Sequence, residues 1–314
     1  MSFAGRRFSL FRALLVGLIA TCWAATPVGL LAQDATVAAP TVAAVAAEAP
    51  TAAASVTAVA PTLAANLIVE PRVLVIAHRG ASADAPENTL PAFQQALDAN
   101  SDLVELDYVH TSDGVPLVIH DGTLDRTTDA EAVFGGRDIP VDSKPLAELL
   151  KLDAGSWLDR KFAGTRLPTL EESLELIQTR SITLIERKAG DAKTCVELLE
   201  RKRLVPHVVV QSFDWDYLAD CHRLSPQLVL GALGGKELTP ERLAAIARTG
   251  AKVVGWSEGD LDRTAVDMLH NGGYRVWAYT VDDRRRAREL VELGVDGIIT
   301  NTPGRMRALV DNPR

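Results

Sequence analysis

The pattern of hydrophobic and polar residues changes abruptly near residue 70. From Pro71 onward, short runs rich in β-branched residues alternate with longer segments in which apolar residues recur every three or four positions. The short runs predict buried strands and the longer segments predict amphipathic helices. The eight predicted strands are Val73–Ala77, Leu103–Asp107, Ile182–Glu186, Val208–Gln211, Leu228–Gly231, Lys252–Gly255, Arg275–Ala278 and Gly297–Thr300. The clearest helical patterns are Thr89–Ala99, Thr169–Thr179, Ala192–Arg203, Pro240–Thr249 and Asp283–Leu293.

Eight strand–helix repeats in about 240 residues are typical of a parallel (β/α)₈ TIM barrel of the α/β class. A doubly wound open sheet is the alternative fold. It is less favoured because no glycine-rich phosphate loop follows the first strand.

One segment interrupts the alternation of strands and helices. Asp113-Gly114 lies between two apolar runs, which predicts a hairpin after the second barrel strand. Residues 115–120 are therefore expected to return as an extra antiparallel strand outside the barrel. A two-residue turn would pair Ser112 with Val115 and place His120 directly opposite Asp107. Residues 122–168 then form an insertion near the barrel mouth that carries Phe134, Trp157 and Phe162.

Two segments precede the domain, which is expected over residues 69–314. Residues 1–32 combine a basic start, the apolar run Leu14–Ala20 and a small residue at Ala32, a pattern typical of a secretory signal peptide. An uncleaved N-terminal anchor is the alternative, although the run is short for a membrane span. Residues 33–68 are rich in Ala, Val, Thr and Pro and predict a flexible linker. The mature protein is thus expected to be exported, periplasmic or secreted, with no stable membrane span.

Composition limits the classes of partner and the cysteine chemistry. Of the 314 residues, 47% are apolar and 24% are charged, which is ordinary for a globular protein, and the formal net charge is −8. That charge disfavours non-specific binding to nucleic acid or to an anionic membrane. Cys195 and Cys221 occupy two neighbouring predicted helices, where either a disulfide or two separate buried thiols would fit.

Acidic residues gather where the predicted strands end. In a TIM barrel, catalytic groups lie at the carboxyl ends of the strands. Glu105 and Asp107 are two apart on one strand and so share a face, and Glu186 ends the next barrel strand. Three converging carboxylates are costly unless a cation neutralises them. Oxygen ligands suit Ca²⁺ or Mg²⁺, so the sequence predicts a divalent cation site.

Two histidines are expected beside this cation site. His78 ends the first predicted strand, and the hairpin brings His120 toward Asp107. Paired imidazoles suit general acid–base phosphoryl transfer, with Arg79 and Lys188 as cations that offset phosphate charge. Structural roles are expected for the remaining histidines, which are His207, His222, His270 and, farther out on the hairpin, His110.

The order of these motifs resembles the glycerophosphodiester phosphodiesterase family. The matching motifs, between about residues 73 and 304, are His78-Arg79-Gly80, Pro86-Glu87-Asn88-Thr89, Glu105-Leu106-Asp107, His120-Asp121, Leu124-Asp125-Arg126-Thr127-Thr128, Leu167-Pro168-Thr169-Leu170, Glu186-Arg187-Lys188, Gln211-Ser212-Phe213, Thr280-Val281-Asp282 and Asp296-Gly297-Ile298-Ile299-Thr300. The resemblance implies a TIM barrel with an insertion after the second strand. It also implies hydrolysis of glycerophosphodiesters to glycerol 3-phosphate and an alcohol.

The resemblance further implies a role for each site residue. His78 and His120 match acid–base histidines; Glu105, Asp107 and Glu186 match ligands of calcium or magnesium; Arg79 and Lys188 match phosphate contacts. The expected supporting residues are Glu87, Gln211, Trp277 and Tyr279, although Trp277 and Tyr279 could instead pack inside the barrel. The resemblance also implies that the glycerol hydroxyl attacks first, giving a cyclic phosphate that water then opens.

The chain departs from the family pattern at two positions. Asp282 stands where the family often has Asn, and Asn301 stands where Asp is common. Both are expected to tune the pocket without contacting the metal or the histidines.

Three functions remain open at this point. The first is a metal-dependent glycerophosphodiesterase acting on a small soluble diester. The second is a lysophospholipase D, for which the insertion residues Phe134, Trp157 and Phe162 could line an acyl groove. The third is a non-enzymatic module that captures phosphodiesters, which the presence of both histidines and all three carboxylates disfavours.

Overall fold

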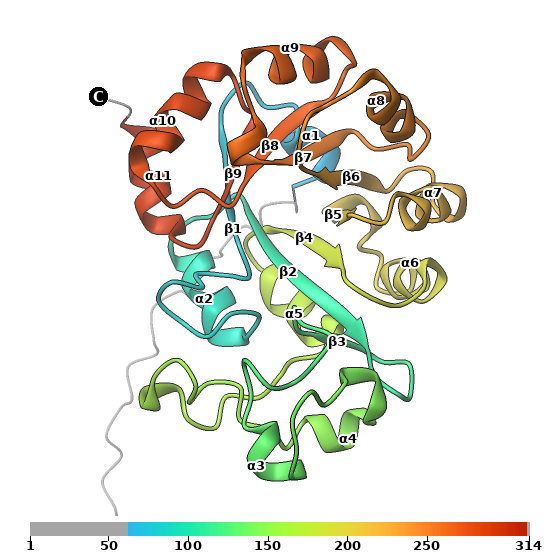
Figure 1. Ribbon diagram of the computed structural model, residues 1–314, viewed down its shortest axis with the longest axis vertical. Coiled ribbons are helices and arrows are strands. Elements are labelled where there is room, and N and C mark those ends of the chain that lie inside the picture. Colours follow the sequence, from blue (N-terminus) through green and yellow to red (C-terminus); the bar gives the residue numbers. More distant parts are fainter. Residues whose placement is uncertain (1–61, 313–314) are drawn as a thin grey trace, which may run out of the picture. The chain divides into compact units, whose positions relative to one another are not determined.

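Eight parallel strands close into a barrel in the computed structural model, which describes residues 62–312 (Figure 1). The order is β1-β9-β8-β7-β6-β5-β4-β2, and β1 also pairs with β2 to complete the ring. The extra strand β3 runs antiparallel beside β2. The strands are β1 Leu74–Ala77, β2 Leu103–His110, β3 Pro116–Val118, β4 Ile182–Arg187, β5 Val208–Ser212, β6 Val229–Gly234, β7 Val253–Ser257, β8 Arg275–Tyr279 and β9 Gly297–Thr300. All eight predicted barrel strands and the TIM-barrel class are confirmed.

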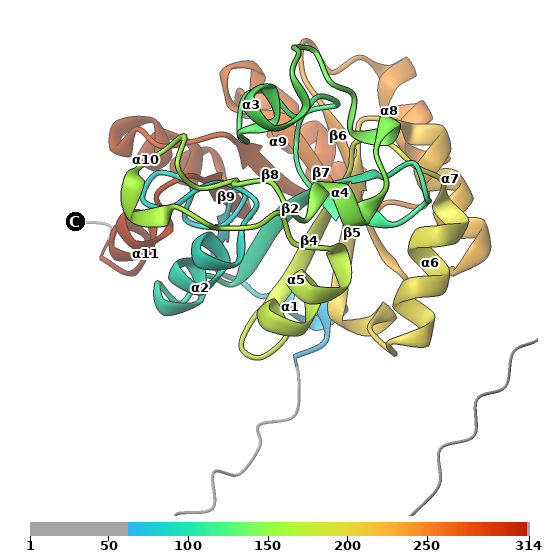
Figure 2. The ribbon, with the colours of Figure 1, turned by 90° about the horizontal axis from the view of Figure 1, so that it is seen from below.

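Residues 62–312 contain eleven α-helices, most of which form an outer layer around the barrel (Figures 1 and 2). They are α1 Ala64–Leu67, α2 Leu90–Asp98, α3 Ala130–Phe134, α4 Leu146–Leu149, α5 Leu170–Ile177, α6 Ala192–Arg201, α7 Trp215–Leu224, α8 Pro240–Ala247, α9 Arg263–Asn271, α10 Arg284–Leu293 and α11 Pro303–Asp311. Within residues 62–312, none of these helices has the length and apolar character needed to cross a membrane.

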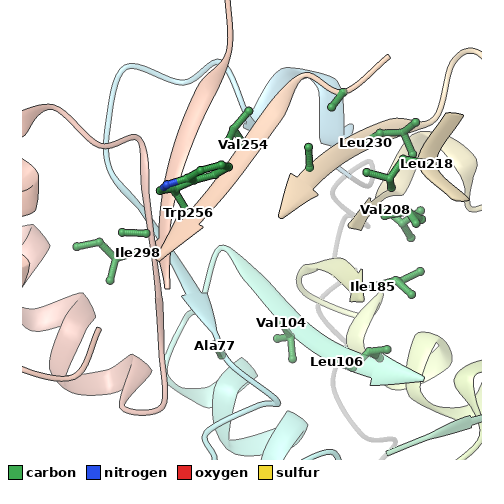
Figure 3. Close-up of a cluster of buried hydrophobic side chains, with 14 of the residues drawn as sticks. Ala77, Val104, Leu106, Ile185, Val208, Leu218, Leu230, Val254, Trp256 and Ile298 are labelled. Atoms are coloured by element: carbon green, nitrogen blue, oxygen red, sulfur yellow. The ribbon is translucent and has the colours of Figure 1, made fainter. Parts of the chain in front are cut away.

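Side chains along each strand point alternately outward and inward, and so form two buried apolar layers, one between the barrel and the helices and one inside the barrel. On β2, the outward side chains of Val104 and Leu106 belong to an apolar cluster that also contains Ile185 of β4 and, farther round the barrel, Leu218 of α7 (Figure 3). Inward side chains such as Leu103 fill the lower part of the barrel. Because both faces are buried, each strand reads as a nearly continuous apolar run, which is typical of parallel sheets.

A short helix covers the amino-terminal end of the barrel. Ala64 and Leu67 of α1 are buried and belong to the same apolar cluster as the inward residues Leu74 and Leu103 (Figure 2). The linker was expected to extend to residue 68, but Ala64, Leu67 and Ile68 are buried against the barrel, so the packed domain begins before residue 69. The expected signal peptide and most of the expected linker lie outside the described residues.

The hairpin is present, but its register differs from the prediction. Thr111 pairs with Val115, and the amide of Gly114 donates to the carbonyl of Thr111 (2.9 Å), so the connection has three residues rather than two. Gly114 has a φ of +78°, as expected for a type I turn followed by a bulge. Asp107 consequently faces Ile119, whose amide donates to the Asp107 carbonyl (3.1 Å), and not His120. The slip of one residue is the kind that reverses which face a strand residue occupies.

The insertion has its own small core. Apolar side chains from β2 and β3, including Val109 and Leu117, pack with residues of the insertion such as Leu124 and Leu149. Phe134 packs partly buried on this cluster.

Elsewhere in the fold, Cys195 on α6 and Cys221 on α7 are separate buried thiols, which decides between the two cysteine states left open by the sequence.

Candidate active site at the barrel mouth

Three buried carboxylates meet where β2 and β4 end. Glu105, Asp107 and Glu186 each place an oxygen within 4.8 Å of the others, and Asp107 and Glu186 are direct partners in the β2–β4 register. Burial and the neighbouring negative charges raise the pKa of Glu105 well above its ordinary value, and the pKa of Glu186 rises for the same two reasons. The cluster therefore resists full ionisation unless positive charge is added.

The hydrogen bonds of this cluster fit a bound cation. Glu105 Oε2 accepts from the amide of Arg79 (2.7 Å), and Asp107 Oδ2 accepts from the Asn88 side chain (2.8 Å). The other oxygens, Glu105 Oε1 and Asp107 Oδ1, are buried and accept no hydrogen bond from the residues that the structure describes. Glu105 and Asp107 thus each have one oxygen held by a hydrogen bond and a second that accepts none, with Lys188 near the second oxygen of Asp107. This all-oxygen donor set suits a hard divalent cation.

Two cationic side chains border the carboxylates. Arg79 Nε lies 3.2 Å from Asp107 Oδ2, and Lys188 Nζ lies 3.3 Å from Asp107 Oδ1 and also pairs with Glu186. Arg79 has a φ of +56°, in the left-handed region that non-glycine residues seldom occupy. Such backbone strain is common at functional sites, where surrounding contacts hold it. Here the backbone of Arg79 is held by the hydrogen bond from its amide to Glu105 and by the contacts of its side chain.

His78 lies directly after β1 on the inner rim of the barrel. Its Nδ1 is 2.7 Å from Oδ1 of Asn301, which follows β9. Burial, followed by the positive charge of Arg79, lowers the pKa of His78. The imidazole is therefore neutral at neutral pH. The expectation that Asn301 would not contact a histidine was wrong, because closure of the barrel places the ends of β1 and β9 side by side.

His120 reaches the site although the predicted register was wrong. The chain leaves the β3 strand after Val118, and His120 Nδ1 lies 2.6 Å from Asp121 Oδ1. Burial lowers the pKa of His120, and the negative charge of Asp107 opposes this shift. Arg126 links this region to the barrel, since it donates to Asp121 (2.6 Å) and to both oxygens of Glu87 (2.8 and 2.7 Å).

Glu87 does not belong to the carboxylate cluster but contacts Arg79, which borders it. It accepts from Arg79 Nη1 (2.8 Å) as well as from Arg126, and these contacts with the two guanidinium groups lower its pKa despite its burial. The ionised carboxylate thereby fixes the orientation of Arg79.

A small pocket opens beside the carboxylates. His78, Glu186, Gln211 and Tyr279 contribute polar groups to its wall, and its remaining lining residues are Phe213, Leu233 and Ile299. Trp277 was predicted to support the site, but it is fully buried in the apolar layer below, two residues before Tyr279 on β8. The alternative that it packs inside the barrel is correct.

Comparison with known proteins identifies the group to which this arrangement belongs. The model of the glycerophosphoryl diester phosphodiesterase family matches residues 78–305, which include all of the carboxylates, histidines and cations described above. The chain belongs to the glycerophosphoryl diester phosphodiesterase family. The resemblance seen in the motifs is thereby confirmed.

Matches to relatives in this family cover most of the chain. Proteins named glycerophosphodiester phosphodiesterase from Caldanaerobacter subterraneus and Bacillus subtilis are 34% and 33% identical to it. Each match covers 76% of this chain, and 98% and 86% of the respective relative. The structure of an Oleispira antarctica phosphodiesterase in complex with the product sn-glycerol-3-phosphate matches with a TM-score of 0.69 and 29% identity, over 76% of this chain and 97% of that one.

Asn88 and Asp121 had no predicted role in this site, and the role predicted for Asn301 was wrong. Asn88 contacts both the carboxylate and the amide of Asp107, Asp121 contacts His120, and Asn301 contacts His78. Asn88 and Asp121 lie inside motifs that the sequence displays. Their roles were missed because a motif indicates that a residue matters without showing which atom it holds.

Proposed function

We propose that this chain hydrolyses glycerophosphodiesters to glycerol 3-phosphate and an alcohol, with a divalent cation, calcium or magnesium, held by Glu105, Asp107 and Glu186. The observation that carries this proposal is the buried carboxylate cluster, in which one oxygen of Glu105 and one of Asp107 accept no hydrogen bond from the described residues while Arg79 and Lys188 lie beside them. The substrate class follows from the named relatives and from the product bound to the Oleispira protein.

The charge balance of the site supports an anionic substrate. The three carboxylates carry three negative charges when ionised, and Arg79 and Lys188 supply two positive charges. A divalent cation would bring this group to a net charge of about +1, which a phosphodiester monoanion would neutralise. Without the cation, the group has no net positive charge to attract a phosphodiester, which would bind poorly.

The chain's own residues then perform the proton transfers. One of His78 and His120 removes the proton from the attacking oxygen, which belongs to water or to a glycerol hydroxyl, and the other donates a proton to the alcohol oxygen as its bond to phosphorus breaks. If the glycerol hydroxyl attacks, water then opens the resulting cyclic phosphate to give glycerol 3-phosphate. Arg79 and Lys188 offset the charge on the non-bridging phosphate oxygens. When bound, the divalent cation adds further positive charge at those oxygens. Glu87 and Asp121 hold Arg79 and His120 in position.

Replacement of the two histidines distinguishes an enzyme from a capture module. H78A and H120A are each expected to bind glycerophosphocholine in the presence of calcium, as measured by calorimetry, while turnover falls by at least about 100-fold. H207A is the matched control, because His207 contacts the Thr62 carbonyl at the other end of the barrel. Unchanged turnover in both site variants would contradict the two-histidine mechanism.

A soluble diester is favoured over a lysophospholipid. Phe134, one of the three aromatic residues available for an acyl groove, packs partly buried on the core of the insertion, with Lys144 Nζ 4.5 Å from its ring centroid. Trp157 donates its indole N–H to the Ala154 carbonyl (2.9 Å). Equal turnover of lysophosphatidylcholine and glycerophosphocholine would contradict this preference.

We also infer that the protein is exported to the periplasm or beyond, after removal of residues 1–32. The basis is the basic and apolar pattern of that segment alone. Recovery of the mature chain outside the cytoplasm, with an N-terminus near Gln33, is the expected result. A full-length chain retained inside the cell would contradict it.

A further inference from the structure

His78, Asn301 and Asp282 form a chain of hydrogen-bonded side chains that joins the ends of β1, β9 and β8. His78 Nδ1 contacts Asn301 Oδ1 at 2.7 Å, and Asn301 Nδ2 donates to Asp282 Oδ2 at 2.6 Å. Asp282 Oδ1 also accepts from the amide of Asn301 (2.8 Å) and from the hydroxyl of Thr300 (2.8 Å). One oxygen of Asp282 therefore binds the Asn301 side chain, and the other binds the backbone of Asn301 and the neighbouring Thr300.

The contact with Asp282 determines which way the Asn301 amide faces. A carboxylate only accepts hydrogen bonds, so the NH₂ group must point toward Asp282. The reversed amide would set two acceptor oxygens against each other and lose this bond. The carbonyl oxygen of Asn301 must then face His78. The Ser82 hydroxyl lies 2.8 Å from this oxygen and also 2.8 Å from the His78 carbonyl.

The orientation of this amide in turn determines the tautomer of His78. Asn301 Oδ1 can only accept, so the neutral imidazole must carry its proton on Nδ1. Its Nε2 then has a free lone pair. Nε2 makes no hydrogen bond with the residues that the structure describes, and the His78 side chain lines the pocket next to Glu186.

We propose that Asp282 and Asn301 are positioning residues that hold His78 with its proton on Nδ1, so that Nε2 accepts the proton of the attacking hydroxyl. This inference rests on the proposed function, in which His78 takes part in catalysis. Proton balance is simple: the hydroxyl proton moves to Nε2 and gives an imidazolium, whose Nδ1–H remains bonded to Asn301.

Nitrogen-15 NMR of histidine-labelled protein tests the tautomer without any assay of activity. The signals of His78 are assigned by their loss in H78Q, and the spectra are recorded at pH 8 with saturating calcium and again after chelation. The expected result is a protonated Nδ1 and an unprotonated Nε2 for His78. Protonation at Nε2 would overturn the proposal whatever the activity. The expected tautomer in a protein inactive on glycerophosphocholine would instead refute the proposed function and leave the positioning role intact.

Exchange of the two side chains provides the kinetic test. In D282N, the Asn301 amide loses its fixed orientation, and kcat is expected to fall by about 10-fold or more while KM changes little. The double variant D282N/N301D again places one amide against one carboxylate and an acceptor oxygen against His78, so it should recover most of the lost kcat. D283N is the matched control, because Asp283 caps α10 through the Arg286 amide, and asparagine also caps helices. Equal losses in D282N and the double variant would contradict the proposal.

Discussion

Replacement of Glu105 by glutamine should make the metal-free protein more stable. Two unit charges 4.8 Å apart repel by about 3.5 kcal/mol at an effective dielectric constant of about 20. Glu105 faces two such charges, on Asp107 and Glu186, inside a buried cluster. In the absence of a cation, the folded protein therefore keeps a proton on Glu105 that the unfolded chain releases. Glutamine removes this requirement and preserves the oxygen that accepts from the Arg79 amide.

The size of the effect follows from proton linkage. A carboxyl group whose pKa is raised in the folded state binds more protons there than in the unfolded chain, so the free energy of unfolding falls as pH rises. The fall is about 1.4 kcal/mol per pH unit above the ordinary pKa of glutamate, until the folded-state pKa is reached. Between pH 5 and pH 7, E105Q should gain up to about 3 kcal/mol relative to the wild type.

Urea unfolding of chelator-treated protein at several pH values measures this difference directly. E200Q is the control, because Glu200 is exposed on α6 and should show the wild-type slope. Calcium should stabilise the wild type, since a ligand of the folded state raises its free energy of unfolding, and should stabilise E105Q far less. Parallel pH dependences for wild type and E105Q would show that Glu105 is ionised without a cation and would refute the reasoning.

Three further changes test individual contacts. N88A removes the amide that holds the Asp107 carboxylate and should weaken calcium binding by about 10- to 100-fold in calorimetry; an unchanged affinity would contradict that role. G114A places a side chain at a φ of +78° with open space around it, so it should lower the free energy of unfolding by about 1 kcal/mol through backbone strain alone. L67A should lower it by about 2–5 kcal/mol, because Leu67 is buried against the barrel; a loss below about 0.5 kcal/mol would place this segment outside the fold.

The barrel could be predicted because its strands carry a simple signal. Each barrel strand is buried on both faces, and each is separated from the next by a segment with helical periodicity, so both signals alternate along the chain. The inward positions of Glu105, Asp107 and Glu186 followed from the two-residue period of a strand. Parallel strands all have their carboxyl ends on the same side of the barrel, so these three carboxylates could be predicted to meet at its mouth.

Other features could not be predicted because they depend on local geometry or on distant contacts. The Asp113-Gly114 signal fits both two- and three-residue hairpin loops, and the choice between them shifted the partner of Asp107 from His120 to Ile119. Helix α1 is too short to show a period and continues an alanine-rich segment.

The contact between His78 and Asn301 spans 223 positions of sequence and exists only because the barrel closes. Trp277 has the inward orientation of Tyr279 but lies one layer deeper, a difference of depth that alternation alone does not show. The period of a strand thus predicts the direction of a side chain, whereas its distance from the mouth depends on where the neighbouring strands end.

Hydrolysis of glycerophosphocholine by protein stripped of metal and then reloaded tests the central claim most directly. The account predicts that stripped wild-type protein is inactive, that calcium or magnesium restores release of glycerol 3-phosphate, and that neither ion restores it in E186Q. Full activity of the exhaustively stripped wild-type protein would contradict the claim that the carboxylate cluster acts by holding a cation.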